Sequence, residues 1–355
     1  MNKAFLIVIL FFALTSCSPK PDYYSYSDFK SVSKSDVHLH INSTYPAYMQ
    51  LAVDNNFRII SPNVDSEIPV SMQLDTASAI AAKWPGRFYF LGTFSVDGYG
   101  KPDFADSIIT TIQKCMSKGA SGIKVWKNIG MVLRDTSGKY IMVDNPSFEP
   151  VFRYLEANRI PVMGHLGEPR NCWLPLSEMT DTSNYRYYKS HPQYHMYMHP
   201  EAPSYDDQMN ARDNVLRKFP ELAFEGAHFA SLEWSIDELA KRLDSFPNLS
   251  VDMSARMGHL QYQSIADYEK VKKFLLKYQD RIMYGTDITV GMNERNPQAR
   301  TSQIYDRWIS NWVYLATDST QQIKNLPGEV RGMHLPKTVI DKIYNTNAEK
   351  FFRLQ

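Results

Sequence analysis

Two histidines two positions apart raise the first question of chemistry in this sequence. His38 and His40 lie in the run "SDVHLHINS", in a chain of 355 residues with nine histidines. Side chains at positions i and i+2 of a β-strand point to the same face, so a strand here would aim Asp36 and both imidazoles into one volume. Such a pair is either half of a metal site or an accident, and the rest of the chain decides between the two.

Three further polar residues end apolar runs that read as buried strands. His165 closes "IPVMGH", His228 closes "LAFEGAH" and Asp287 closes "RIMYGTD". Each alone would be an ordinary helix cap or core residue. In a barrel of parallel strands, however, functional residues gather at the carboxyl ends of the strands. The set, with His38 and His40, therefore predicts one common site.

Eight short apolar runs alternate with stretches such as "DFADSIITTIQKCMSKG", whose apolar residues recur every three to four positions. This alternation predicts parallel strands joined by right-handed crossovers. Eight strands favour a closed (β/α)₈ TIM barrel over an open doubly wound sheet, which would need a strand-order switch that the sequence does not reveal. The predicted strands are 36–41, 57–61, 88–93, 122–126, 160–165, 222–228, 249–254 and 281–287, with closing helices near 300–316 and 336–352.

A long insertion follows the fifth predicted strand. Residues 167–206 are rich in Tyr, Pro, Met and His and predict a lid over the barrel mouth. Within them, His191, His195 and His199 are spaced by four in "HPQYHMYMHP". Two prolines limit any helix there, and no carboxylate is suitably placed. The run therefore favours a lid that contacts substrate over a second metal site.

The chain begins with "MNKAFLIVILFFALTSC". Its eleven-residue apolar run is too short to span a bilayer and matches the apolar region of a secretory signal. The Leu-Thr-Ser-Cys ending resembles a bacterial lipobox, which implies a lipid on Cys17; a plain cleaved signal is the alternative. We expect a signal over 1–17, a tether over 18–34 and the barrel over 35–355. The protein would be exported to the bacterial cell envelope and contact the membrane only through its lipid.

Composition is that of an ordinary globular protein, with 43% hydrophobic residues, 22% charged residues and a formal charge of +1. This balance gives no electrostatic basis for binding nucleic acid or an anionic membrane surface. Cys115 and Cys172 remain in the mature body. Export permits a disulfide between them, and two buried thiols fit the sequence equally well. The sequence does not determine the oligomeric state.

The ordered set of strand-end residues, from HxH on strand one to "GTD" on strand eight, resembles the amidohydrolase superfamily. More specifically it resembles the amidohydrolase-2 branch, which contains aminocarboxymuconate-semialdehyde-decarboxylase-like proteins and several lactonases. The resemblance implies that His38, His40, His165 and Asp287 bind one divalent ion, and that His228 is the catalytic base. Imidazoles with a carboxylate suit Zn²⁺, with Mn²⁺ as the alternative. Asp287 would also accept the proton of the attacking water and pass it to the leaving group.

Lys124, in "GIKVWKNIG" on the fourth strand, leaves two readings open. Other amidohydrolases use a carbamylated lysine there to bridge two metals, and His228 would then bind the second ion. We favour instead that Lys124 and Lys127 bind substrate oxygens at the mouth, because the overall pattern follows the mononuclear branch. Arg170 could grip a carboxylate. The remaining candidates for substrate contact are Trp126, Trp173, Arg256, His259 and Tyr262.

These observations predict an exported, metal-dependent hydrolase that opens a lactone, ester or amide of a small polar molecule, with a sugar-derived lactone as the leading substrate. A non-hydrolytic decarboxylase is the first alternative, because the same metal and His228 could protonate a carbanion after loss of CO₂. The second alternative is a non-catalytic envelope binding lipoprotein. Such a protein would have no reason to keep every strand-end residue.

Overall fold

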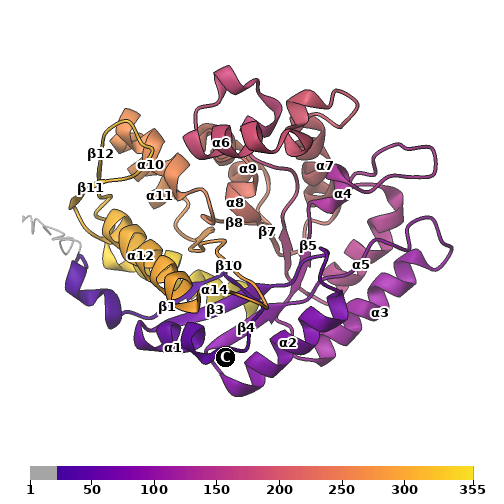
Figure 1. The fold of residues 1–355 in the computed structure, drawn as a ribbon, viewed down its shortest axis with the longest axis horizontal. Helices are drawn as coiled ribbons and strands as arrows, with labels where there is room; N and C mark the ends of the chain where they lie inside the picture. The colour runs from indigo at the N-terminus through magenta and orange to yellow at the C-terminus, as the bar shows by residue number, and fades with distance from the viewer. Residues whose placement is uncertain (1–21, 355) are drawn as a thin grey trace, which may run out of the picture.

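The computed structural model describes residues 22–354, which form an α/β fold of short parallel strands followed by helices (Figure 1). The predicted signal over 1–17 and the first residues of the predicted tether lie outside this range. Within residues 22–354, no helix is both long and apolar enough to cross a membrane.

Ten short strands pair in parallel, which confirms the predicted α/β class. Their pairing orders are β1-β3-β4, β5-β6-β7-β8-β9 and β10-β2. A single parallel bridge between Gly92 and Ile123 links β4 to β5. The strands are β1 (Lys34–Asp36), β2 (His40–Ile41), β3 (Phe57–Pro62), β4 (Phe88–Leu91), β5 (Ile123–Val125), β6 (Val162–Gly164), β7 (Phe224–Gly226), β8 (Leu249–Asp252), β9 (Ile282–Met283) and β10 (Thr289–Val290).

A strand overlaps each of the eight predicted runs, but the first run is split into β1 and β2. The Asp36 carboxylate accepts a hydrogen bond from the His38 backbone amide at 3.2 Å. Such local side-chain contacts compete with a regular strand ladder. Beyond the split, Leu39 donates its amide to the Ile60 carbonyl, so the chain still follows β3.

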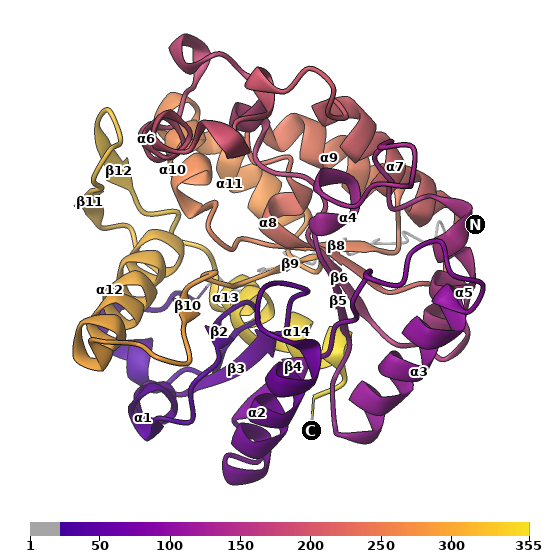
Figure 2. The ribbon, with the colours of Figure 1, turned by 45° about the vertical axis from the view of Figure 1, so that its right-hand side comes forward.

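The helices lie outside the strands, as Figure 2 shows for α2, α3, α5 and α7. In α3, Ile108, Ile112 and Cys115 recur at helical spacing and are all buried, so one stripe of the helix packs inward. The helices are α1 (Pro46–Asp54), α2 (Val70–Lys83), α3 (Phe104–Ser117), α4 (Asn128–Met131), α5 (Glu149–Ala157), α6 (Thr182–Ser190), α7 (Tyr205–Lys218), α8 (Ala227–Ala230), α9 (Ile236–Ser245), α10 (Met257–Ala266), α11 (Tyr268–Lys277), α12 (Pro297–Ala316), α13 (Lys337–Asp341) and α14 (Asn347–Phe352). A π-helical turn, η7 (Lys342–Thr346), joins the last two, and an antiparallel hairpin of β11 (Thr320–Gln322) and β12 (Glu329–Arg331) follows α12.

The described part of the predicted tether, residues 22–34, packs against the body. Its 3₁₀ helix η1 (Tyr26–Lys30) buries Phe29 in edge contact with Trp312. Lys34 is fully buried and donates from Nζ to the Val32 carbonyl at 2.5 Å and to the Phe29 carbonyl. Burial lowers the pKa of Lys34 to about 7. The segment also contacts the body through Lys34, whose Nζ lies 4.9 Å from the ring centroid of Phe57. These contacts explain why the segment is folded, and the sequence alone did not reveal them.

The predicted lid segment, residues 167–206, follows β6 and lies at the top of Figure 1 around α6. It folds on a small interior of its own, in which the Cys172 thiol donates to the Tyr194 carbonyl at 3.1 Å and His195 bonds the Leu174 carbonyl at 2.8 Å. Cys172 in this segment and Cys115 in α3 are both free and buried. The short 3₁₀ helices of residues 167–206 are η3 (Arg170–Trp173), η4 (Leu176–Glu178), η5 (Pro192–Tyr194) and η6 (Met196–Met198). A further 3₁₀ helix, η2 (Pro146–Phe148), precedes α5.

Candidate active site

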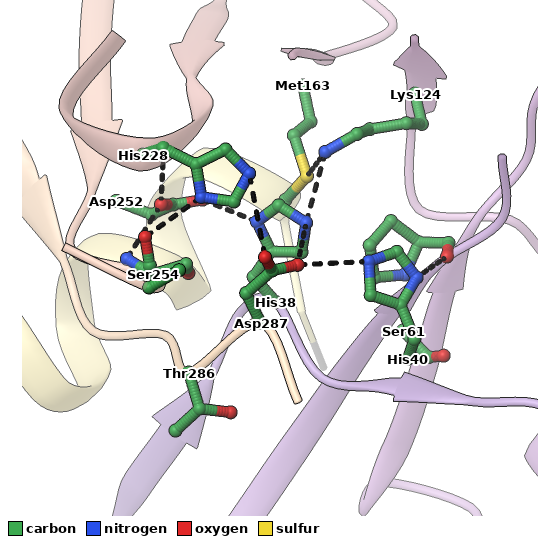
Figure 3. A network of polar contacts seen from close by, with 12 residues as sticks. His38, His40, Ser61, Lys124, Met163, His228, Asp252, Ser254, Thr286 and Asp287 are labelled. Carbon is green, nitrogen blue, oxygen red and sulfur yellow. Dashed lines mark hydrogen bonds and ion pairs between the residues drawn. The ribbon is translucent and has the colours of Figure 1, made fainter. Parts of the chain in front are cut away.

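Four predicted site residues, which come from three predicted strands, meet in one place (Figure 3). His38 Nε2 lies 3.5 Å from Asp287 Oδ1, and His40 Nε2 lies 3.4 Å from the same oxygen. His228 Nε2 lies 3.9 Å from Asp287 Oδ2. The ligand-capable atoms of His38, His228 and Asp287 all lie within 4.8 Å of one another, which makes these three a candidate metal site.

The three histidines turn the same nitrogen toward Asp287. In each ring, Nδ1 faces an oxygen that only accepts hydrogen bonds, so Nδ1 carries the proton and Nε2 keeps a lone pair. Three lone pairs and a carboxylate thus converge, which is the donor set that a divalent cation requires. The Nδ1 partners are Asp252 for His38 at 2.9 Å, the Pro62 carbonyl for His40 at 2.8 Å, and the Ser254 carbonyl for His228 at 2.8 Å.

The protonation states match this donor set. Burial lowers the pKa of His38 and brings the pKa of His228 to about 3, so both rings are neutral at pH 7. Burial alone would raise the pKa of Asp287, but attraction to the neighbouring histidines in their protonated forms, His228 foremost, holds it well below its usual range, so the carboxylate is ionised at pH 7. Neutral imidazoles with an ionised carboxylate fit Zn²⁺ or a similar ion.

His165 approaches the cluster from the side of His228. Its ring centroid lies 4.3 Å from that of His228, with the rings nearly perpendicular. Its Nε2 is buried and makes no hydrogen bond with residues 22–354. Burial lowers the pKa of His165 well below its usual value, so the ring is neutral and one of its two nitrogens has a lone pair that could bind a metal ion. The structure therefore brings all five predicted ligand and base residues to one region.

Lys124 lies inside the fold rather than at the mouth. Its side chain is fully buried, and Nζ lies 3.1 Å from both His38 Nε2 and Met163 Sδ (Figure 3). Burial lowers the pKa of Lys124 to about 8. The other lysine of the pair, Lys127, forms an ion pair with Glu168. Lys124 thus contacts a predicted metal ligand directly, which is a position nearer to the bridging alternative than to the mouth.

Four of the remaining candidates for substrate contact line two different cavities, and two line neither. Arg256 and His259 line a cavity of about 1040 Å³ that also includes Asp287. Arg170 and Trp173 line a separate cavity of about 440 Å³, where the Arg170 guanidinium lies 4.1 Å from the ring centroid of Trp234. Arg170 and Trp173 are therefore not brought to Asp287. Trp126 follows β5 half-buried, and Tyr262 is 42% exposed on α10.

Two buried carboxylates that sequence reasoning did not assign to the site orient its members. Asp252, at the end of β8, bonds His38 and also accepts from the His228 amide at 2.8 Å. Asp36 accepts from Thr286 Oγ1 at 2.7 Å and from the Trp308 indole at 2.9 Å. Asp36 therefore points to the neighbours of Asp287 rather than into the cluster. Asp252 ends an apolar run, so the criterion used for the other strand ends could have found it.

The backbone that carries His228 is left-handed. Residues His228 to Ser231 have φ angles of 61, 54, 55 and 56°, and none is glycine. Each such residue costs ~1–2 kcal/mol relative to the right-handed conformation. Two hydrogen bonds hold the turn. The His228 backbone amide donates to the Asp252 carboxylate, and the Tyr205 hydroxyl donates to the Ser231 carbonyl at 2.5 Å. A Cβ added at Gly226 would lie 2.4 Å from that of Ala230, so only glycine fits beneath the turn.

Comparison with known proteins places this architecture. A family model described as amidohydrolase matches residues 67–354, which include His165, His228 and Asp287 but not His38 and His40. The 2,6-dihydroxybenzoate decarboxylase from Rhizobium matches with a TM-score of 0.53 and 16% identity, over 91% of this chain and 99% of that one. A putative amidohydrolase from Staphylococcus aureus matches with a TM-score of 0.52 and 12% identity, over 91% and 100%. Such identities establish a shared fold, and no curated protein matches by sequence.

Proposed function

This chain belongs to the amidohydrolase family, and on that basis we propose that it is a metal-dependent hydrolase that opens a lactone, ester or amide bond in a small polar molecule. A sugar-derived lactone is the leading substrate. The observation that carries the proposal is the buried Nε2 of His228, which makes no hydrogen bond with residues 22–354 and lies 3.9 Å from Asp287, beside the two other imidazole lone pairs. A base held next to a cation site is the arrangement that hydrolysis needs.

We propose that the parallel strands close into a (β/α)₈ barrel and that residues 167–206 cover its mouth. Closure is supported by the amide of His40, which donates to the Ile288 carbonyl at 2.9 Å, and by the amide of Val37, which donates to the Tyr284 carbonyl at 3.0 Å. The lid is supported by Asp181, at the start of α6, because it lines the same cavity as Asp287.

His38, His40, His165 and Asp287 would hold one divalent ion, Zn²⁺ with Mn²⁺ as the alternative. The convergence of His38 and His40 on one oxygen of Asp287 supports this set. The buried Nε2 of His165, which has no hydrogen-bond partner among residues 22–354, supports it as well. A bound ion would polarise the scissile carbonyl and make hydroxide available near neutral pH.

The protein's own groups would move the protons. His228 Nε2 accepts a proton from the attacking water, because Nδ1 is committed to the Ser254 carbonyl and its ring cannot turn away without losing that bond. The Asp287 carboxylate is the nearest further acceptor and would pass the proton to the leaving group. One such acid–base group contributes ~10²–10⁴-fold to the rate.

The test is metal analysis followed by a substrate screen. Purified protein should contain about one divalent ion per chain and should acidify unbuffered solutions of a sugar lactone or an ester. Hydrolysis of an amide would be followed by the amine that it releases. Release of CO₂ from a carboxylated substrate without hydrolysis would instead establish the decarboxylase alternative. Absence of bound metal together with full affinity for a small ligand would favour a binding lipoprotein and overturn the proposal.

We also propose that the protein is exported and lipid-anchored in the cell envelope, from the apolar run and lipobox that precede the described residues. Cys17→Ala should abolish incorporation of radiolabelled palmitate and release the protein or leave its precursor uncleaved. A mature wild-type protein that starts at another residue and carries no lipid would contradict the anchor.

A further inference from the structure

Arg256 is a charged residue of the Asp287 cavity that lacks a protein acceptor for its charge. Its guanidinium has five N–H donors, and one bond is made, from Nη1 to the Ala255 carbonyl at 3.2 Å. Its Nε is buried and makes no hydrogen bond with residues 22–354, and no carboxylate oxygen in that range lies within 4.0 Å of its nitrogens. A buried donor without a partner costs ~1–3 kcal/mol. A ligand group would remove that cost.

The start of α10 adds further donors beside Arg256. Arg256 is the N-cap residue of this ten-residue helix, and no side chain caps its first turn. Gly258 lines the cavity, and an added Cβ there would meet nothing within 4 Å, so the first turn faces open space. His259, on the same turn, also lines the cavity, and its buried Nε2 makes no hydrogen bond within the described part of the chain. A helix N-terminus with free amides attracts negative charge.

The cavity around Arg256 carries charges of both signs. Its lining includes three carboxylates and three further cations: Asp181, Asp287, Asp306, Arg300, Arg307 and Lys324. Glu233 is buried nearby, and burial raises its pKa to about 7, so it only partly balances the charge of Arg256 at neutral pH. Arg256 also lies close to the proposed base, because the carbonyl of Ser254, two residues before it, accepts the hydrogen bond from His228 Nδ1 at 2.8 Å.

We propose that Arg256 and the first turn of α10 bind a carboxylate carried by the substrate. The planar fork of an arginine matches the two oxygens of a carboxylate. The inference rests on the proposed function in placing the scissile bond at His228 and Asp287. The substrate is then a lactone, ester or amide with a free carboxylate away from the bond that breaks, held at one end by Arg256 and at the other by the proposed metal site.

The experiment measures binding of butyrate to the full mature protein by ligand-observed NMR, after chelation of metal so that the histidine cluster cannot hold the probe through an ion. Butyrate should bind the wild type, and Arg256→Gln should weaken it at least tenfold, because a hydrogen-bonded pair with charge contributes ~1.5–3 kcal/mol. Arg256→Lys, which keeps the charge but not the fork, should fall between them. Neutral butyramide should bind all forms weakly and equally.

Arg307→Gln is the matched control, because Arg307 is an exposed arginine lining the same cavity, and it should leave butyrate affinity within twofold of wild type. Equal butyrate affinity in wild type and Arg256→Gln, with unchanged circular dichroism, would overturn the inference. Tighter, Arg256-dependent binding of inorganic phosphate would overturn the carboxylate assignment. Metal content is measured separately on untreated protein, so failure of the proposed function is distinguishable from failure at Arg256.

Discussion

Asp252→Asn tests whether a buried carboxylate sets the tautomer of a metal-binding histidine. Oδ1 of Asp252 accepts the amides of His228 at 2.8 Å and Ser254 at 2.9 Å, while Oδ2 faces Nδ1 of His38 at 2.9 Å. An asparagine has one acceptor atom. If its amide nitrogen faced the two backbone N–H groups, two donor pairs would clash. The asparagine must therefore keep its oxygen on the backbone and present N–H to His38.

The expected consequence is a change in the tautomer of His38. Nδ1 would then have to accept a hydrogen bond, so the proton would move to Nε2, the nitrogen that faces Asp287. A protonated Nε2 cannot bind a metal ion, and loss of such an outer partner costs ~10–100-fold in metal affinity. This range corresponds to ~1.4–2.8 kcal/mol, which agrees with the ~1.5–3 kcal/mol expected for one hydrogen bond to a charged group.

The assay is zinc affinity by competition with a fluorescent chelator, with near-ultraviolet circular dichroism as the check on folding. Asp213→Asn is the matched control, because Asp213 is buried and paired with Arg212 at 2.6 Å but touches no predicted ligand. It should lower the melting temperature and leave zinc affinity unchanged. A folded Asp252→Asn protein with wild-type zinc affinity would refute the tautomer argument.

Three further predictions address the metal count, the lid and the N-terminal segment. His228→Asn should keep one ion and lose ~10²–10⁴-fold in kcat, and Lys124→Ala should also keep one ion; elemental analysis showing two ions in wild type and fewer in both variants would replace the mononuclear assignment with a bridged pair. Deleting residues 171–203 should impair substrate binding more than folding, since the segment has its own small interior. We expect a higher KM with little change in melting temperature; loss of all soluble, metal-bound protein would show that the segment is structural. The pKa of Lys34 is about 7 in the folded protein, below its ordinary value of 10.5. The unfolded chain therefore binds more protons between these pH values, and the free energy of unfolding should rise with pH there by at most about 1.4 kcal/mol per pH unit. Urea titrations at pH 7.5, 8.5 and 9.5 should show this rise reduced in Lys34→Met, and equal slopes in the two proteins would contradict it.

The strands and the clustering of their polar ends could be predicted because both depend on local patterns. Apolar runs bounded by turn residues locate β3 and β8, and His38 and His40 approach the same oxygen of Asp287 because strand ends share one face. The strand β10 escaped prediction, since its two residues, Thr289 and Val290, carry too little pattern.

Contacts between residues far apart in the chain could not be predicted. Asp36 was expected to share a face with the histidines, yet it bonds the indole of Trp308, 272 positions away. Arg170 was a candidate for gripping substrate, yet it stacks on Trp234 in another cavity. The acceptor or aromatic ring that a polar side chain contacts depends on how elements far apart in the sequence pack together. No local hydrophobic periodicity encodes that packing.

The left-handed turn from His228 to Ser231 has a consequence for how this protein can be improved by selection. Glycine would relieve its conformational cost at Phe229 or Ala230. A library screened for thermal tolerance alone should therefore enrich glycine at these positions. A screen for turnover should reject the same substitutions, because a more flexible turn allows the imidazole of His228 to move away from Asp287. Selection for thermal stability and selection for catalytic rate would therefore favour different residues at Phe229 and Ala230.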